Sequence, residues 1–106
     1  NSKKMLDEIS NKGELLREHL NTLNGEINIF QEIRGKGMMI GGVLKNEIDQ
    51  KATEIVNISK KNGLLVLSAG ENVIRLLPPL NISENELKAG INRLSISLKE
   101  FKININ

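Results

Sequence analysis

The sequence contains no cysteine, and this absence excludes two kinds of site at once. Without thiols the chain can form neither a disulfide framework nor a thiolate zinc site. The chain also has a single histidine, His19, which cannot build an imidazole metal site alone. We therefore expect no metal-dependent chemistry.

Aromatic side chains and net charge are also scarce. The 106 residues include two phenylalanines, Phe30 and Phe101, but no tryptophan or tyrosine, and the formal net charge is +2. Charged residues of both signs are interspersed, so there is no basic stripe that would neutralise a row of phosphates. A small RNA-binding α+β domain would in addition need aromatic residues on its sheet. We expect no nucleic-acid partner.

Long apolar segments are missing as well. No run approaches the roughly 20 residues that span a bilayer, and the N-terminal segment NSKKMLDEIS lacks the apolar core of a signal peptide. We therefore expect no membrane partner and a cytoplasmic location. The length fits one small domain, residues 1–106. Because the sequence starts without methionine, in what reads as the middle of a helix, we expect a fragment of a longer protein.

Apolar periodicity predicts three helices. The first covers Ser2–Leu23, with a stop at Asn24-Gly25. A second, capped by Asp49, should run to about residue 62. A capping box of Ser83 and Glu86 opens the third, and the tail from residue 102 to 106 is expected to fray. The inner face expected for the second helix is Ala52, Ile55, Val56 and Ser59, and that for the third is Leu87, Ile91, Leu94, Leu98 and Phe101.

Four short segments read as strands. Two of them, Ile29–Arg34 and Met38–Lys45, would be joined by a tight turn at Gly35 to Gly37. The others are Leu64–Leu67 and Val73–Leu77. The glycines at 41 and 42 predict a bulge or a close backbone contact. The predicted fold class is α+β, with a small, mainly antiparallel sheet of about four strands and helices on one side.

Two features that could suggest chemistry have simpler interpretations. The segment GKGMMIG, from Gly35 to Gly41, has the glycine spacing of a dinucleotide-binding loop, but a strand rather than a helix is predicted after it. It reads better as a glycine-rich hairpin. No motif around His19 argues for a catalytic triad, and the carboxylates form no obvious pair with a raised pKa.

Two arginines remain as candidates for binding. Arg34 precedes the glycine turn, and Arg75 lies in the apolar run VIRLL before Pro78 and Pro79. Each could be a structural arginine that pairs with a carboxylate or with free carbonyls. Each could instead present a bidentate fork to a substrate carboxylate. The apolar neighbours of Arg75 favour the second interpretation, since a dry site would strengthen such a contact.

The segments IRGKGMMIGGVL and NGLLVLSAGENVIRLLPPLNISENEL resemble the C-terminal small domain of class III, pyridoxal-phosphate-dependent aminotransferases of fold type I. The resemblance covers nearly the whole chain, and within the family it is closest to the acetylornithine/succinyldiaminopimelate branch. Its most specific element is the spacing from Ala69-Gly70 through Arg75 to Pro79-Leu80. Leu76 stands where many relatives have phenylalanine.

The resemblance implies a role for one residue of this chain. The family's arginine at the position of Arg75 binds the α-carboxylate of the amino-acid substrate. The Schiff-base lysine and the aspartate that pairs with the pyridine nitrogen belong to the family's large domain. The resemblance therefore implies pyridoxal 5'-phosphate in the full-length enzyme, no cofactor or catalytic residue in this chain, and an inactive fragment.

The implied reaction transfers the amino group of N-acetylornithine or succinyldiaminopimelate to 2-oxoglutarate, in arginine or lysine biosynthesis. The implied partners are these small molecules, the protein's own large domain and a second copy in a homodimer. The alternative is a stand-alone α+β module that binds an amino acid or mediates assembly without catalysis, which the fold cannot exclude. The preferred acyl group and the role of Arg34 stay open.

Overall fold

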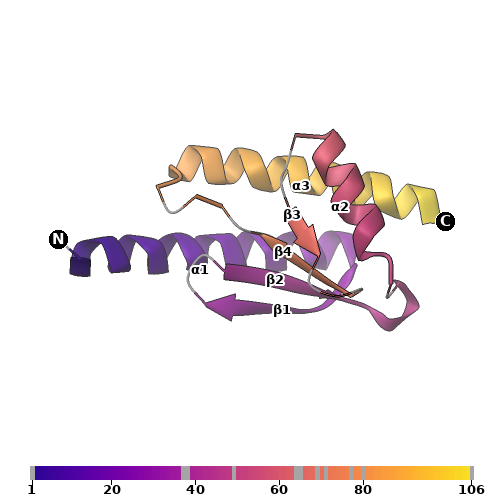
Figure 1. Cartoon of the computed structure of the whole chain (residues 1–106), viewed down its shortest axis with the longest axis horizontal. Coiled ribbons are helices and arrows are strands. Elements are labelled where there is room, and N and C mark those ends of the chain that lie inside the picture. Colours follow the sequence, from indigo (N-terminus) through magenta and orange to yellow (C-terminus); the bar gives the residue numbers. More distant parts are fainter. Residues whose placement is uncertain are drawn as a thin grey trace.

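The computed structural model describes residues 2–36, 39–48, 50–63, 66–68, 70, 72–76, 78–79 and 81–105. Single α-helices alternate with pairs of strands along the chain (Figure 1). The elements are α1 (Ser2–Ile27), β1 (Phe30–Lys36), β2 (Met39–Leu44), the 3-10 turn η1 (Asn46–Ile48), α2 (Ala52–Lys61), β3 (Val66–Ser68), β4 (Val73–Leu76) and α3 (Glu84–Ile105).

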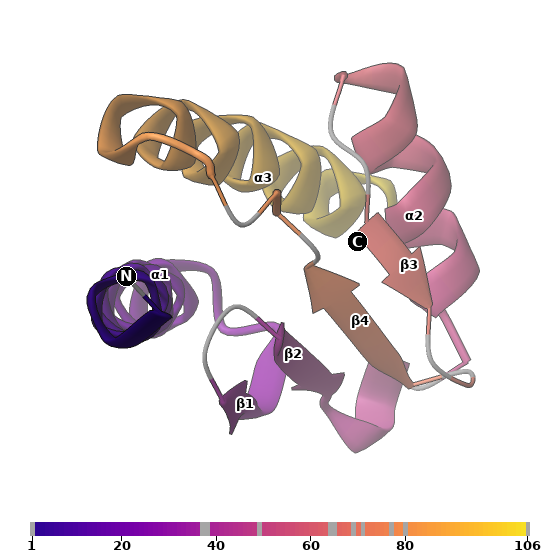
Figure 2. The ribbon, with the colours of Figure 1, turned by 60° about the vertical axis from the view of Figure 1, so that its left-hand side comes forward.

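The four strands form one antiparallel sheet in the order β1-β2-β4-β3. Helix α1 packs on β1 and β2, α2 packs on β3 and β4, and α3 contacts both of these helices (Figure 2). Helices α1 and α3 lie side by side and run in the same direction (Figure 1). The predicted α+β class, with a small antiparallel sheet and helices on one side, is confirmed.

Helix α1 extends beyond the predicted stop at Asn24-Gly25. The buried Ile27 adds one more turn to its apolar stripe, and Asn28, rather than Gly25, takes the left-handed conformation with φ 62°. The side chain of Asn24 closes the helix end instead: its Oδ1 accepts hydrogen bonds from the backbone N–H groups of Ile29 and Phe30 at 2.9 and 2.8 Å. The predicted stop at Asn24-Gly25 was wrong, because the helix continues to Ile27 and the Asn24 side chain accepts hydrogen bonds from the backbone N–H groups that follow the helix.

The C-terminal tail is helical as far as residue 105, so the prediction that it frays from Lys102 was wrong for the described residues. Lys102 Nζ donates a hydrogen bond to the carbonyl oxygen of Ile27, at the end of α1. The buried Phe101 holds the preceding turn in the core. These contacts anchor the last turns to the first helix.

Other predictions about element ends have mixed outcomes. The capping box of α3 is confirmed, since Ser83 Oγ accepts a hydrogen bond from the Glu86 N–H at 3.1 Å and Glu86 Oε1 accepts one from the Ser83 N–H at 3.0 Å. The predicted cap Asp49 lies outside the described residues, and Lys51 occupies the N-cap position of α2 without a side-chain cap. The predicted turn includes position 37, also outside them, whereas Gly35 belongs to β1.

The strand register separates the two faces of the sheet. In β4, Ile74 and Leu76 are buried and point toward the helices, whereas Arg75 between them is exposed on the opposite, open face. Ile40 pairs with Leu76 and Gly41 pairs with Arg75, so β2 alternates in the same sense. The main core lies between the helices and the inner face of the sheet.

Candidate functional site

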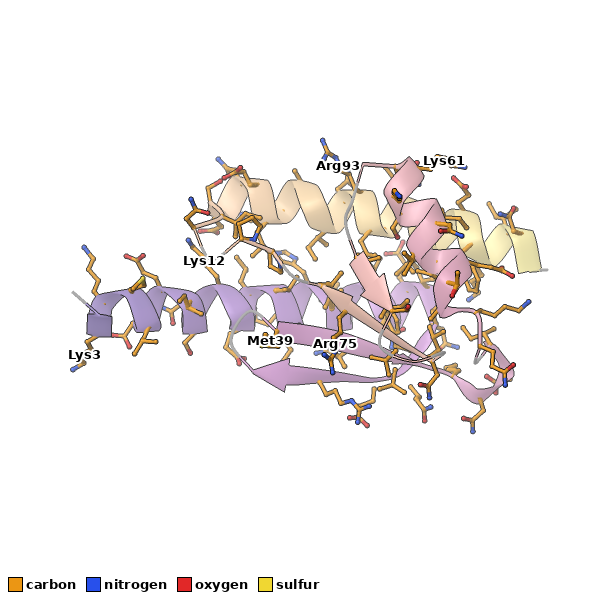
Figure 3. The ribbon with its side chains drawn as sticks, viewed as in Figure 1. Lys3, Lys12, Met39, Lys61, Arg75 and Arg93 are labelled. Atoms are coloured by element: carbon orange, nitrogen blue, oxygen red, sulfur yellow. The ribbon has the colours of Figure 1, made fainter. Side chains whose placement is uncertain are left out.

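A cavity of about 330 Å³ opens at the sheet, and both candidate arginines line it. Its described lining comes from β1, β2 and β4: Arg34, Gly35, Met39, Gly41, Val73, Arg75 and Leu76. Figure 3 shows Arg75 and Met39 as neighbours beside the strands. The cavity combines apolar side chains with two guanidinium groups, which is the composition expected of a site for a small organic anion.

Arg75 is placed by the alternation of β4. Its neighbours Ile74 and Leu76 fill the inner face, and the two-residue period of a strand then directs the arginine to the open face. The expectation of a dry, apolar setting for Arg75 was wrong, because its neighbours in sequence point to the other side of the sheet. Exposure avoids the cost of burying an unpaired charge.

The guanidinium of Arg75 has no interaction partner among the described residues. Across the described part of the chain it makes no hydrogen bond and no ion pair, so the interpretation as a structural arginine has no support there. An arginine carries five N–H donors in a planar fork that matches a carboxylate. Arg75 therefore offers its full donor set to a ligand in the cavity.

Arg34 lies in the same cross-strand row. It pairs with Gly41 in the β1–β2 register, and Gly41 pairs with Arg75 in the β2–β4 register, so one glycine separates the two arginines. Arg34 Nη1 also lies 3.8 Å from Glu32 Oε2, with both side chains more than half exposed. An exposed ion pair of this kind contributes little to stability, about 0–1 kcal/mol. Arg34 thus has a partner, whereas Arg75 has none among the described residues.

The other features that were considered from the sequence give no sign of a catalytic, cofactor or metal site. His19 is partly buried in α1, and its Nε2 has no hydrogen-bond partner among the described residues. The residues after the glycine segment form strand β2, so the hairpin interpretation of that segment holds and a dinucleotide loop is excluded there. No group of three or more metal-ligating side chains occurs within the described ranges.

Two carboxylates have lowered pKa values, and both serve the scaffold. The hydrogen bonds from the Ser83 backbone and side chain lower the pKa of Glu86, and the hydrogen bond from Lys61 lowers the pKa of Glu100. Neither lines the cavity. None of the helices in the described ranges is long and apolar enough to cross a membrane.

Sequence reasoning did not place Gly35, Met39, Gly41 or Val73 in a site. Gly41 and Gly42 were expected to mark a bulge or a close contact. The irregularity of the β1–β2 register lies instead at Phe30 and Glu32, whereas the close contact exists at Gly42, next to the Phe30 ring. Placing Gly41 on the open face requires the β2–β4 register, which the sequence does not specify alone.

Comparisons with known proteins agree on one family. The family described as Aminotransferase class-III matches residues 1–98. The chain is 38% identical over 100 residues to an acetylornithine aminotransferase from Xanthomonas axonopodis pv. citri (strain 306), a match that covers 94% of this chain and 24% of that protein.

Solved structures give the same result for the fold. The crystal structure of N-acetylornithine aminotransferase from Stenotrophomonas maltophilia K279a matches with a TM-score of 0.90 and 33% identity, covering 95% of this chain and 28% of that one. An ornithine aminotransferase from Plasmodium yoelii matches with a TM-score of 0.83 and 27% identity, over 94% of this chain and 26% of that one. The chain spans about a quarter of the length of these relatives.

Proposed function

The chain belongs to the class III aminotransferase family, and from this premise we propose that it is the C-terminal small domain of such an enzyme and binds the substrate carboxylate through Arg75. One observation carries the proposal. Arg75 is an exposed guanidinium without an ion-pair partner among the described residues, and it lies on the wall of a 330 Å³ cavity, at the position where the family's sequence pattern places its carboxylate-binding arginine.

The chemistry of this contact is a bidentate, charge-assisted hydrogen bond. Two N–H groups of Arg75 donate to the two oxygens of the substrate carboxylate, which fixes the orientation of the molecule as well as its position. With the carboxylate held, the amino or oxo group at the neighbouring carbon is presented in one geometry rather than many. Strand β4, paired on both edges, provides a stiff support for this orientation.

The proposed substrates follow from the relatives. We propose N-acetylornithine or succinyldiaminopimelate as amino donor and 2-oxoglutarate as acceptor, in arginine or lysine biosynthesis, because the similar proteins include acetylornithine aminotransferases. Each of these molecules carries the α-carboxylate that Arg75 would bind. A homodimeric assembly and a cytoplasmic location stay predictions.

The family implies pyridoxal 5'-phosphate, but the cavity residues do not fit that cofactor by themselves. The described lining provides two guanidinium groups, glycines and apolar side chains, with neither a lysine amine for a Schiff base nor a carboxylate for the pyridine nitrogen. We therefore propose that the cofactor is held by a large domain outside these 106 residues, and that the isolated chain has no aminotransferase activity.

The test is an arginine exchange in the full-length protein that carries this domain. Arg75→Ala should lower kcat/KM for both amino donor and oxo acceptor by at least about 10- to 100-fold, since the loss of even one of the two charge-assisted hydrogen bonds costs about 1.5–3 kcal/mol. Arg75→Lys should recover only part of this loss, because an ammonium cannot form the fork.

Arg93→Ala provides the matched control, because Arg93 is an exposed arginine on α3 that contacts the Gly63 carbonyl and does not line the cavity. Its kcat/KM values should stay at the wild-type level. If Arg75→Ala stays within about threefold of wild type for both substrates, a change of less than 1 kcal/mol, the assigned role is wrong.

A further inference from the structure

Three glycines lie at or next to the cavity, and the structure explains two of them. Gly35 has φ +128°, a backbone conformation that side chains rarely adopt, and a Cβ there would collide with the Met39 carbonyl. Gly42 faces the core, where a Cβ would lie 2.5 Å from Cδ1 of Phe30. Backbone conformation accounts for the first glycine and side-chain packing for the second.

Gly41 fits neither explanation. Its φ is outside the left-handed region. A Cβ there would lie 3.3 Å from the Ile74 carbonyl oxygen, 3.6 Å from Val73 Cγ1 and 3.7 Å from Arg75 Cγ, so a methyl group would be accommodated after a shift of a few tenths of an ångström. Glycine within a strand is unfavourable by about 0.5–1 kcal/mol relative to alanine. The contact to the Ile74 carbonyl is tight, but it is much less severe than the collisions at Gly35 and Gly42.

The place of Gly41 in the cavity gives a different reason for the glycine. It is buried beneath the cavity that it lines, and it separates Arg34 from Arg75 in their cross-strand row. A side chain at position 41 would rise on the open face directly against the stem of Arg75. It would occupy part of the cavity beside that stem.

We propose that Gly41 forms the floor of the carboxylate subsite. This inference rests on the proposed function of Arg75 and deepens it. The carboxylate and the adjacent carbon of a linear amino or oxo acid lie over the bare backbone of Gly41, with Arg75 at one side. Gly41 acts by leaving volume for the substrate, and it makes no contribution to the chemistry itself.

The experiment uses Gly41→Ala and Gly41→Val in the full-length protein, with glutarate as a probe that binds without reacting. The inhibition constant of glutarate should rise at least about fivefold for the alanine variant and more for the valine variant. KM for both substrates should rise in parallel, while kcat changes by less than about threefold. The melting temperature of Gly41→Ala should stay within a few degrees of wild type, because the tight contact with the Ile74 carbonyl opposes the gain from replacing a strand glycine.

Val43→Ile is the matched control. Val43 lies two residues along β2 on the same face, pairs with Val73 and does not line the cavity, so an added methylene there should leave glutarate inhibition at the wild-type level. A second readout uses the 106-residue chain itself. The side-chain Nε–Hε NMR signal of Arg75 should shift on addition of glutarate in wild type, and less in Gly41→Ala.

The outcomes separate the two proposals. If Arg75→Ala weakens glutarate inhibition while both Gly41 variants bind it as tightly as wild type, the floor assignment is overturned and the carboxylate role of Arg75 stands. If Arg75→Ala has no effect, both proposals fall. Should Gly41→Val not fold, Gly41→Ala decides alone, and wild-type inhibition by glutarate in that variant overturns the inference.

Discussion

Adding a single methyl group at Gly42 tests whether β1 and β2 pair in the observed register. An ideal Cβ at Gly42 would lie 2.5, 2.6 and 2.9 Å from three ring carbons of Phe30, all well inside van der Waals contact. Phe30 is 5% exposed and packed into the core, so its ring has little space into which to move. Overpacking of this kind costs about 1–3 kcal/mol.

Part of that cost is offset, because replacing glycine by alanine lowers the conformational entropy of the unfolded chain, which stabilises the folded state by about 0.4–1 kcal/mol. We therefore expect Gly42→Ala to lower the free energy of unfolding by about 1–2 kcal/mol. At about 4–8 °C per kcal/mol for a domain of this size, the melting temperature should fall by about 5–15 °C. Urea unfolding followed by circular dichroism gives the first quantity, and a thermal melt gives the second.

Two further variants make this test specific. Gly25→Ala adds the same methyl group inside α1, where a Cβ would have nothing within 4 Å, and should raise stability by about 0.5–1 kcal/mol. Phe30→Leu removes the ring edge that Gly42→Ala would meet, so the double variant should be about 1 kcal/mol more stable than the sum of the two single changes predicts. Additive losses, or an unperturbed Gly42→Ala, would mean that this ring does not lie over Gly42.

Four further substitutions test the helices and their caps. Ser83→Ala removes the hydroxyl that accepts the Glu86 N–H, and should lower the free energy of unfolding by about 1 kcal/mol in urea titrations; an unchanged midpoint would contradict the capping box. The pKa of Glu86 is lowered from 4.5 in the folded chain, so its ionised form stabilises the fold above that pH and the contribution is lost as pH falls through the folded pKa. Glu86→Gln should therefore flatten the acid limb of a plot of melting temperature against pH, and an acid limb identical to that of wild type would refute this origin. Ser59 and Ser97 are both fully buried, but of their two hydroxyl groups only that of Ser97 has hydrogen-bond partners among the described residues. Ser59→Ala should therefore be neutral or stabilising, whereas Ser97→Ala should cost about 1 kcal/mol, and equal effects of the two changes on the free energy of unfolding would contradict this difference.

Local signals in the sequence predict the elements well and their ends less well. The helix that starts at Ser83 was predicted from its capping box and its apolar spacing, both of which are properties of adjacent turns. The end of α1 depends on Asn24, whose side chain reaches the backbone of residues 29 and 30 only after the chain has turned. The helical tail depends on a contact between Lys102 and Ile27, which are far apart in sequence.

The candidate site shows the same division between local and long-range information. Arg75 was identified from its sequence context, but the direction of its side chain follows from the alternation of β4. That Arg34 lies in the same row follows from two strand registers, neither of which the sequence specifies alone. The glycine between them was visible in the sequence, and its place in the cavity was not.

The position of β4 between β2 and β3 has a consequence for motion. Because β4 has a neighbour on each edge, the backbone of Arg75 cannot leave its place by the fraying that loosens edge strands and termini. Its amide should be among the slowest to exchange with deuterated solvent, on the timescale of sheet opening. Any adjustment of the guanidinium to different ligands would then come from rotation about side-chain bonds, in nanoseconds or less for an exposed residue.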